Sequence, residues 1–427
     1  MLRHAIRIYG LLFLTISIAL IFTIITLTFF NSLIQTVYAQ PSVVDDDLDV
    51  EAAVEGLSSP TGMAFLDDNN ILVLEKRGNV RLVVNGILQE RPILQVPVSA
   101  EGESGLLGVA IANGSVSSNR DITNANVFLY FTEADPLRNR IYKYQWDGET
   151  LTNPTLILDL PAGPRPNHNG GKMIIGPDGY LYAVIGDKNR DGQLQNFADG
   201  PLDDTGGILR INPEDGSAAP NNPFISSNNN VLSKFYAYGI RNSFGIDLDP
   251  VTGMLWDTEN GPDSYDEINL VSPGFNSGWE TVMGPISGSE ESEEDLVNFP
   301  GSHYADPLFS WATTVAPTDM EFFSSSNLGE RYTNNIFVGD ITRGNLYFFQ
   351  VNENRDGISA DKADLSDLVI DNEDELSAIT FGNGFGGITD IETGPDGSLY
   401  VLSDADLITD TDDDGIIYEI SSNPVSR

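Results

Sequence analysis

The sequence predicts an all-β protein, a six-bladed β-propeller with four-stranded blades. Three observations predict this fold. A strand–turn–strand unit recurs six times within residues 54–427, its turns carry hairpin chemistry, and helical patterns are hard to find after residue 40. Units that recur at intervals of roughly 45 to 75 residues indicate radial repetition. A β-sandwich or a pair of barrels is the alternative, but such folds rarely repeat one turn motif so often.

Each unit pairs an apolar strand with a second strand of aromatic and β-branched residues, across a turn rich in Asp, Asn, Gly or Pro. The turns P-D-G and D-P-x-T-G are hairpin chemistry, because glycine supplies the positive φ. The second strands alternate, as in Tyr180-Leu181-Tyr182-Ala183. The units start at Gly62, Gly108, Met173, Gly245, Met320 and Ile391. A final strand, GIIYEI from Gly415, is expected to close the ring by joining the N-terminal blade.

The first 40 residues are a separate element, a signal peptide or membrane anchor. Arg3 and Arg7 precede a long apolar run, and Val37-Tyr38-Ala39 resembles a signal-peptidase site. The run is also long enough to span a bilayer without cleavage. Either interpretation predicts a secreted or cell-surface protein that contacts membrane only through this segment. Residues 41–53 are interpreted as an acidic spacer.

Composition excludes several classes of partner and chemistry. The formal charge of -41 repels nucleic acid and anionic lipid, which bind through clustered cations. The absence of cysteine excludes disulfides, thiolate metal sites and cysteine nucleophiles. Stability must therefore come from core packing, with oxygen-ligated metal as the remaining possibility.

The segment PRPNHNGGKMIIGPDG, residues 164–179, contains His168, one of three histidines in the chain. A histidine on a glycine-bounded loop at the start of a strand can present its imidazole to a cavity. This arrangement suits a general base near neutral pH. A surface histidine on a polar loop is the alternative interpretation.

Further polar segments start at Gly102, Tyr236, Thr258 and Trp311, and a generic blade needs none of them. Arg241-Asn242 follows a glycine, where the guanidinium can bind a carboxylate, a quinone oxygen or a sugar hydroxyl. Gly261-Pro262 lies among four carboxylates, and such oxygens are the ligands that calcium prefers. Loops at one end of a propeller converge, so these segments are expected to share one site.

The motifs GLLG, RPNHNGG…GPDG, GIRN, GP…DEIN and NSGW appear in an order that resembles the soluble quinoprotein glucose/sorbosone dehydrogenases. These are aldose dehydrogenases that use pyrroloquinoline quinone (PQQ) and calcium. The resemblance runs from about Leu57 to Ile420. It implies the six-bladed propeller and the oxidation of an aldose at C1 to a lactone, with electrons passed to an external acceptor.

The resemblance also implies a role for individual residues. His168 would deprotonate the anomeric hydroxyl, and Asp187 would orient it. Arg241 and Asn242 would contact and polarise the quinone. Calcium would lie at the carbonyls of Gly261 and Pro262 or, in another branch of the family, at Glu267 with a backbone oxygen near Ser277.

The chain departs from the family where cations bind the three carboxylates of PQQ. Thr342 stands in place of a lysine, Gly387 and Thr389 in place of two arginines, and Glu103 in place of a glutamine. Losing three charge-assisted hydrogen bonds, each of about 1.5–3 kcal/mol, would weaken binding by several orders of magnitude. Arg343, Lys172 and Lys188 are expected as substitutes.

Two other functions stay open. The propeller could be an extracellular binding module that has lost the quinone and holds carbohydrate or protein, or a calcium-dependent hydrolase resembling a lactonase. Dye reduction with an aldose would support the dehydrogenase. Saturable binding without redox activity would support the module, and quinone-independent hydrolysis of a sugar lactone would support the hydrolase.

Overall fold

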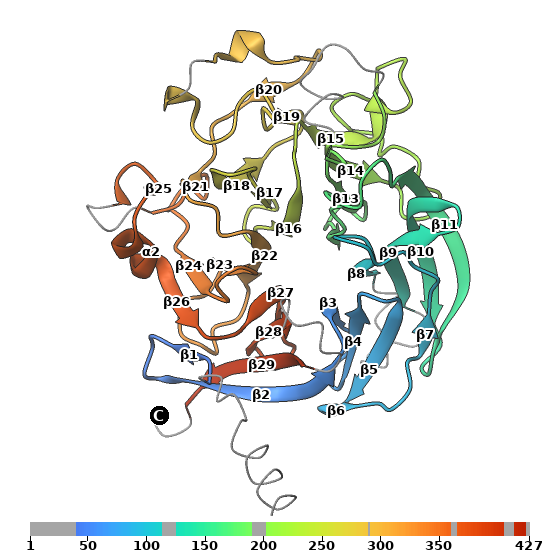
Figure 1. The fold of residues 1–427 in the computed structure, drawn as a ribbon, viewed down its shortest axis with the longest axis vertical. Helices are drawn as coiled ribbons and strands as arrows, with labels where there is room; N and C mark the ends of the chain where they lie inside the picture. The colour runs from blue at the N-terminus through green and yellow to red at the C-terminus, as the bar shows by residue number, and fades with distance from the viewer. Residues whose placement is uncertain are drawn as a thin grey trace, which may run out of the picture. The chain divides into compact units, whose positions relative to one another are not determined.

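The strands of this protein form six sheets arranged around a central axis (Figure 1). The computed structural model describes residues 40–112, 125–189, 202–288, 291–359, 365–404 and 414–423. The innermost strands β3, β8, β12, β16, β22 and β27 contact one another in chain order, and β27 also contacts β3. The sheets therefore close into a ring, and the predicted all-β propeller is confirmed.

The six sheets are numbered I to VI in the order of their innermost strands. Sheet I contains β3 (Pro60–Phe65), β4 (Asn70–Glu75), β5 (Asn79–Val84), β6 (Ile87–Leu88) and β7 (Leu94–Gln95). Sheet II contains β8 (Leu106–Ala112), β9 (Asn126–Ala134), β10 (Leu137–Trp146) and β11 (Leu151–Pro161). Sheet III contains β12 (Met173–Ile175), β13 (Leu181–Ile185), β14 (Gly207–Ile211), β15 (Phe235–Tyr238), β19 (Phe275–Asn276) and β20 (His303–Tyr304).

The other three sheets complete the ring. Sheet IV contains β16 (Ser243–Leu248), β17 (Leu255–Glu259), β18 (Asp266–Val271), β21 (Phe309–Trp311) and β25 (Val369–Ile370). Sheet V contains β22 (Pro317–Phe323), β23 (Asn335–Asp340), β24 (Leu346–Phe349), β26 (Thr380–Asn383) and β1 (Ser42–Val43). Sheet VI contains β27 (Gly387–Thr393), β28 (Leu399–Asp404), β29 (Gly415–Ser422) and β2 (Leu48–Leu57).

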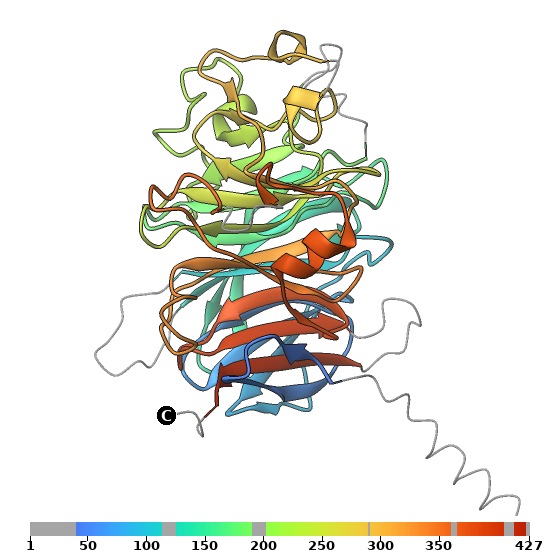
Figure 2. The same cartoon turned by 90° about the vertical axis from the view of Figure 1, so that its left-hand side faces the viewer.

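The expectation of four strands in every blade is wrong. Only sheets II and VI have four strands among the described residues, and the others gain short outer strands. Described helix is limited to α2 (Glu373–Ile379) and the 3-10 turns η1 (Leu232–Lys234), η2 (Ile286–Gly288) and η3 (Glu293–Asp295). Helix α2 lies at the outer edge of the ring, as the side view shows (Figure 2).

The ring is closed by pairing the beginning of the propeller with its end. Strand β29 lies antiparallel to β2, with Leu48 opposite Ser422 and Leu57 opposite Gly415. GIIYEI therefore closes the ring by pairing with the N-terminal strand β2, as predicted, but this pair belongs to the last sheet, VI, and GIIYEI does not join the N-terminal sheet I. Strand β1 and the first half of β2 fall in residues 41–53, so this segment takes part in the sheets instead of serving only as a spacer.

Apolar side chains fill the interface between each pair of neighbouring sheets. The strand β13, whose five residues are all buried, contributes to two of these interfaces: Leu181 and Ala183 face sheet II, while Tyr182 and Val184 face sheet IV. The alternating residues of β13 are therefore buried on both faces of the strand, because each propeller blade is covered by a neighbouring blade on either side.

Carboxylates join neighbouring innermost strands around the ring. Asp319 on β22 accepts the backbone N–H of Ile391 on β27 at 2.8 Å, and Asp390 on β27 accepts the N–H of Met63 on β3 at 2.6 Å. The two aspartates hold the same position in the motifs PTDM and ITDI. They satisfy buried backbone donors that no neighbouring strand reaches.

The segment 1–40, predicted to be a signal peptide or anchor, lies outside the described residues apart from Gln40. Among the helices that the structure describes, none has the length and apolar character to cross a membrane.

Candidate active site

A cavity of about 470 Å³ opens at one end of the ring and is lined by loops and strand ends from all six sheets. Seven of the predicted site residues line it: Glu103, His168, Arg241, Asn242, Gly261, Pro262 and Thr389. Its size is within the range that holds small molecules and cofactors. The cavity therefore confirms the prediction that these distant segments converge.

His168 lies on the loop between β11 and β12 and has a positive φ of 55°. The following Gly170 also has a positive φ, and a Cβ there would meet the carbonyl oxygen of Val184 at 2.6 Å. These features hold the loop tightly against β13. The His168 side chain is nearly buried, with its Nδ1 2.5 Å from Oδ1 of Asp187. Nε2 is therefore the ring nitrogen left for a ligand.

Asp187 follows β13 and does not line the cavity itself. Besides His168, its Oδ1 accepts the backbone N–H of Asn189 at 2.7 Å, and its Oδ2 accepts Nε1–H of Trp279 at 2.8 Å. Burial opposes ionisation of Asp187, but the hydrogen bond and charge of His168 outweigh it, so the pKa of Asp187 is lowered. The pair is arranged as a base and the carboxylate that orients it.

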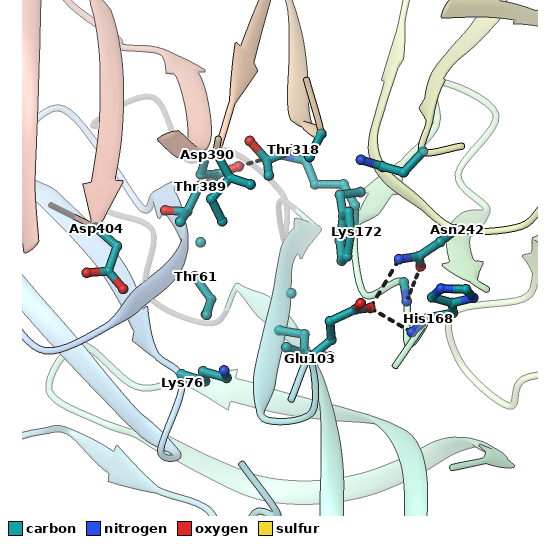
Figure 3. Close-up of a pocket in the computed structure, with 18 of the residues that line it drawn as sticks. Thr61, Lys76, Glu103, His168, Lys172, Asn242, Thr318, Thr389, Asp390 and Asp404 are labelled. Atoms are coloured by element: carbon teal, nitrogen blue, oxygen red, sulfur yellow. Dashed lines mark hydrogen bonds and ion pairs between the residues drawn. The ribbon is translucent and has the colours of Figure 1, made fainter. Parts of the chain in front are cut away.

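Glu103 holds three segments together at the cavity wall. Its Oε2 accepts the backbone N–H of His168 at 2.6 Å and Nδ2–H of Asn242 at 3.1 Å (Figure 3). Its Oε1 accepts Nδ2–H of Asn167 at 3.3 Å. The amide oxygen of Asn242 in turn accepts the N–H of Gly170 at 3.3 Å. Glu103 thereby fixes the backbone that carries His168.

The side chain of Arg241 contacts neutral groups, and its backbone N–H donates to Oε1 of Glu259 at 2.6 Å. Its Nη1 donates to the carbonyl oxygen of Asn260 at 2.9 Å, and its guanidinium lies 5.4 Å from the ring centre of Trp279. Its Nε–H is buried and has no hydrogen-bond partner among the described residues. A buried charged donor without an acceptor is costly, so an acceptor supplied by a ligand would stabilise Arg241.

Two cations expected near the cofactor, Arg343 and Lys188, lie elsewhere, and so does the predicted cofactor residue Thr342. Thr342 and Arg343 do not line the cavity. Arg343 binds Glu373 of α2 with both terminal nitrogens at 2.9 Å, and this hydrogen-bonded pair raises the pKa of Arg343. Lys188 is buried and donates to the carbonyl of Asn167 at 2.8 Å, away from the lining.

Lys172 and Lys76 do line the cavity. Nζ of Lys172 is 2.8 Å from Oδ2 of Asp319 and 2.5 Å from Oδ1 of Asp390. Burial alone would lower the pKa of Lys172, but these carboxylates raise it well above its usual range. Lys76 was not among the predicted site residues, because nothing in strand β4 and the turn after it distinguishes this lysine from a surface residue.

A second polar cluster is buried on one face of sheet IV. Cross-strand pairs place Asp257 opposite Asn269 and Glu259 opposite Glu267, and Glu267 opposite Ser310. Within the described part of the chain, both carboxylate oxygens of Asp257, Oδ1 of Asn269 and Oγ of Ser310 are buried without a hydrogen-bond partner. Burial and mutual repulsion raise the pKa of Asp257 and Glu267 well above the usual range, and burial raises that of Glu259 to about 7.

The four predicted metal-ligating residues are divided between these places. Gly261 and Pro262 line the cavity, whereas Glu267 and Ser277 belong to the sheet IV cluster, where the Ser277 hydroxyl donates to Glu259. Among the described residues, no three carboxylates or histidines are arranged closely enough to form a preformed metal site. The sequence motif alone could not separate the two locations.

Comparison with known proteins identifies relatives of the whole propeller. A family model described as glucose/sorbosone dehydrogenase matches residues 57–410. The aldose sugar dehydrogenase YliI of Escherichia coli is 28% identical over 379 residues, which cover 86% of this chain and 92% of the relative.

Two solved structures share both the fold and part of the sequence. An oxidoreductase (glucose dehydrogenase) from Thermus thermophilus is 30% identical, with a TM-score of 0.68 over 87% of this chain and 99% of that one. The PQQ-bound aldose sugar dehydrogenase of Streptomyces coelicolor is 26% identical, with a TM-score of 0.63 over 90% of this chain and 100% of that one.

Proposed function

The chain belongs to the glucose/sorbosone dehydrogenase family, and from that premise we propose that it is a PQQ- and calcium-dependent dehydrogenase that oxidises aldoses at C1 to lactones. The observation that carries the proposal is the His168–Asp187 pair at the wall of a cavity large enough for a cofactor and a sugar. The orphaned Nε–H of Arg241, in the same cavity, supports an anionic or carbonyl-bearing ligand there.

The residues of the chain would perform the acid–base part of this reaction. Nε2 of His168 takes the proton of the C1 hydroxyl, and Asp187 stabilises the imidazolium that results. PQQ, when bound, supplies the two-electron acceptor for the C1 hydride. Arg241 and Asn242 would hold the acceptor in place. Loss of the hydroxyl proton and of the C1 hydride leaves the lactone.

Calcium would use one or both of the two candidate places. Gly261 and Pro262 line the cavity and would offer their carbonyls. The sheet IV cluster offers Asp257 and Asn269, whose oxygens have no partner among the described residues, beside the carboxylate of Glu267. Oxygen ligands of mixed charge suit this ion, which also offsets the cost of burying carboxylates.

The charge of the cavity favours a second candidate function, a binding module without the quinone. Glu103, Asp266, Asp390 and Asp404 line the cavity, and the family's lysine and two arginines are replaced at Thr342, Gly387 and Thr389. Four carboxylates repel a tricarboxylate unless cations and calcium balance them.

Calorimetric titration of the purified chain with PQQ, with calcium and after chelation, tests the proposal. We expect calcium-dependent binding at micromolar or better and dye reduction with an aldose. His168→Ala should abolish turnover, whereas His303→Ala, on the outer strand β20, should leave it unchanged. A folded protein that binds no PQQ, or His168→Ala with wild-type turnover, would refute the mechanism.

We also propose that the chain works outside the cytoplasm, secreted or held at the cell surface by residues 1–40, and passes electrons to an external acceptor. The Arg-flanked apolar run of this segment supports the proposal. Fractionation of cells that express the full chain, with N-terminal sequencing of the product, tests it. Intact chain in the cytosol would contradict it.

A further inference from the structure

The cavity wall has three described cationic side chains, Lys76, Lys172 and Arg241. Lys172 has little charge to offer a ligand, because Asp319 and Asp390 flank its ammonium group and Glu392 lies 4.0 Å away. Binding a further anion there would require breaking a buried ion pair, which is strongly unfavourable. Two cations, Lys76 and Arg241, remain for a ligand.

Lys76 follows strand β4 of sheet I, and its Nζ donates to the carbonyl oxygen of Gly102 at 2.6 Å. This is a neutral partner, and among the described residues Lys76 has no ion pair. An ammonium group has three donors, so two remain after the bond to Gly102. The bond also fixes the position of Nζ, since the Gly102–Gly105 loop is packed against Lys76: a Cβ at Gly105 would meet the Lys76 carbonyl oxygen at 2.6 Å.

Lys76 and Arg241 come from different sides of the ring. Figure 3 shows Lys76 on one side of Glu103, and Asn242, the neighbour of Arg241, on the other side together with His168. Nζ of Lys76 and Nη1 of Arg241 donate to neutral carbonyl oxygens, and the buried Nε–H of Arg241 has no partner among the described residues. Glu259 and Asp266 also interact electrostatically with the Arg241 guanidinium. An elongated ligand with anionic groups at two ends would satisfy both.

We propose that Lys76 is a specificity-determining residue that binds a terminal carboxylate of an elongated polycarboxylate ligand, while Arg241 binds the opposite part. The inference rests on the proposed function for the identity of that ligand, PQQ. Lys76 then supplies from sheet I a positive charge that Thr342 and Thr389 lack. Because charge-assisted hydrogen bonds to carboxylates are strong, its removal should be measurable in affinity alone.

The experiment measures the Kd of PQQ by calorimetry for the wild-type chain and for Lys76→Met. The matched control is Lys143→Met, which removes a lysine from β10 that is ion-paired with Glu214 and does not line the cavity. We expect Lys76→Met to weaken binding by about tenfold or more, Lys143→Met to change it less than twofold, and Lys76→Arg to stay close to the wild type. Lys76→Gln, whose amide can still donate to Gly102, replaces the Met variant if that variant does not fold.

A second probe, benzene-1,3,5-tricarboxylate, separates this inference from the proposed function. PQQ binding that does not depend on Lys76 overturns the inference and leaves the dehydrogenase proposal standing. Lys76-dependent binding of the tricarboxylate by a chain that does not bind PQQ supports the inference and overturns the dehydrogenase proposal. A folded wild-type chain that binds neither anion overturns both.

Discussion

Replacing Asp187 with asparagine should impair catalysis much more than it impairs stability. The carboxylate accepts hydrogen bonds from His168 and Asn189 at Oδ1, and from Trp279 at Oδ2. Asparagine has one oxygen, so it cannot accept at both positions. If its oxygen faces His168, the amide N–H₂ opposes the donor Nε1–H of Trp279. If the amide is flipped, N–H₂ opposes Asn189 and forces the other tautomer on His168.

Either orientation leaves a buried donor unpaired, at a cost of about 1–3 kcal/mol in the free energy of unfolding. The loss in catalysis should be larger, because the imidazolium also loses its counter-charge. Orienting carboxylates of this kind are worth roughly 100-fold to 10,000-fold in kcat. Urea unfolding and initial rates of dye reduction with an aldose measure the two effects.

Asp249→Asn is the matched control. Asp249 is fully buried and accepts hydrogen bonds from Arg355, Thr252 and the backbone of Val251, but it does not line the cavity. It should lose a comparable amount of stability and keep its kcat. If Asp187→Asn retains kcat within about threefold of the wild type, Asp187 does not orient the base and the mechanism is wrong.

Three further changes test other parts of the site. Glu103→Gln removes a cavity carboxylate, while the amide oxygen of the glutamine can still accept the His168 N–H. Calorimetry should therefore show PQQ binding that is tighter by roughly tenfold. Unchanged affinity would mean that Glu103 does not face the ligand. Lys172→Met leaves two buried carboxylates without a counter-charge and should lower the free energy of unfolding by about 3–5 kcal/mol in urea titrations. The triple variant Lys172→Met/Asp319→Asn/Asp390→Asn should regain this stability. If it does not, the stability lost in Lys172→Met does not come from the unbalanced carboxylates. The pKa of Glu259, raised from 4.5 to about 7, means that the folded chain keeps a proton that the unfolded chain loses, so stability should fall as pH rises between these values. Calcium should therefore raise Tm more at a pH of about 7.5 than at about 5.5, and equal shifts would argue against a calcium site in the sheet IV cluster.

The sequence was sufficient for the fold because blades repeat local chemistry. Hairpin turns such as that at Asp178 and the alternation of β13 are encoded within a few residues, and closure by GIIYEI follows from the need to cover an edge. The short outer strands β19, β20 and β25 were not predicted. Each has two residues, and its pairing depends on loops from elsewhere in the chain rather than on its own pattern.

Site residues within distinctive motifs could be predicted from the sequence, whereas the positions of charged residues that pair with distant partners could not. His168, Arg241 and Asn242 stand in distinctive motifs and do line the cavity. Arg343 was expected there, but its guanidinium pairs with Glu373, a contact between distant segments that no local pattern reveals. Trp279, which holds Asp187, was visible only as part of NSGW, since its hydrogen bond depends on how two blades meet.

Because β2 pairs with β29, the ring closes only late in synthesis. The ribosome delivers β2 early and β29 among the last described residues, so β2 waits without its partner while five other sheets emerge. An unpaired strand recruits other chains. Asp49, Glu51 and Glu55 along β2 give it a negative charge that repels a second copy of itself. On this strand the acidity of the protein serves the nascent chain, because it keeps β2 soluble until β29 arrives.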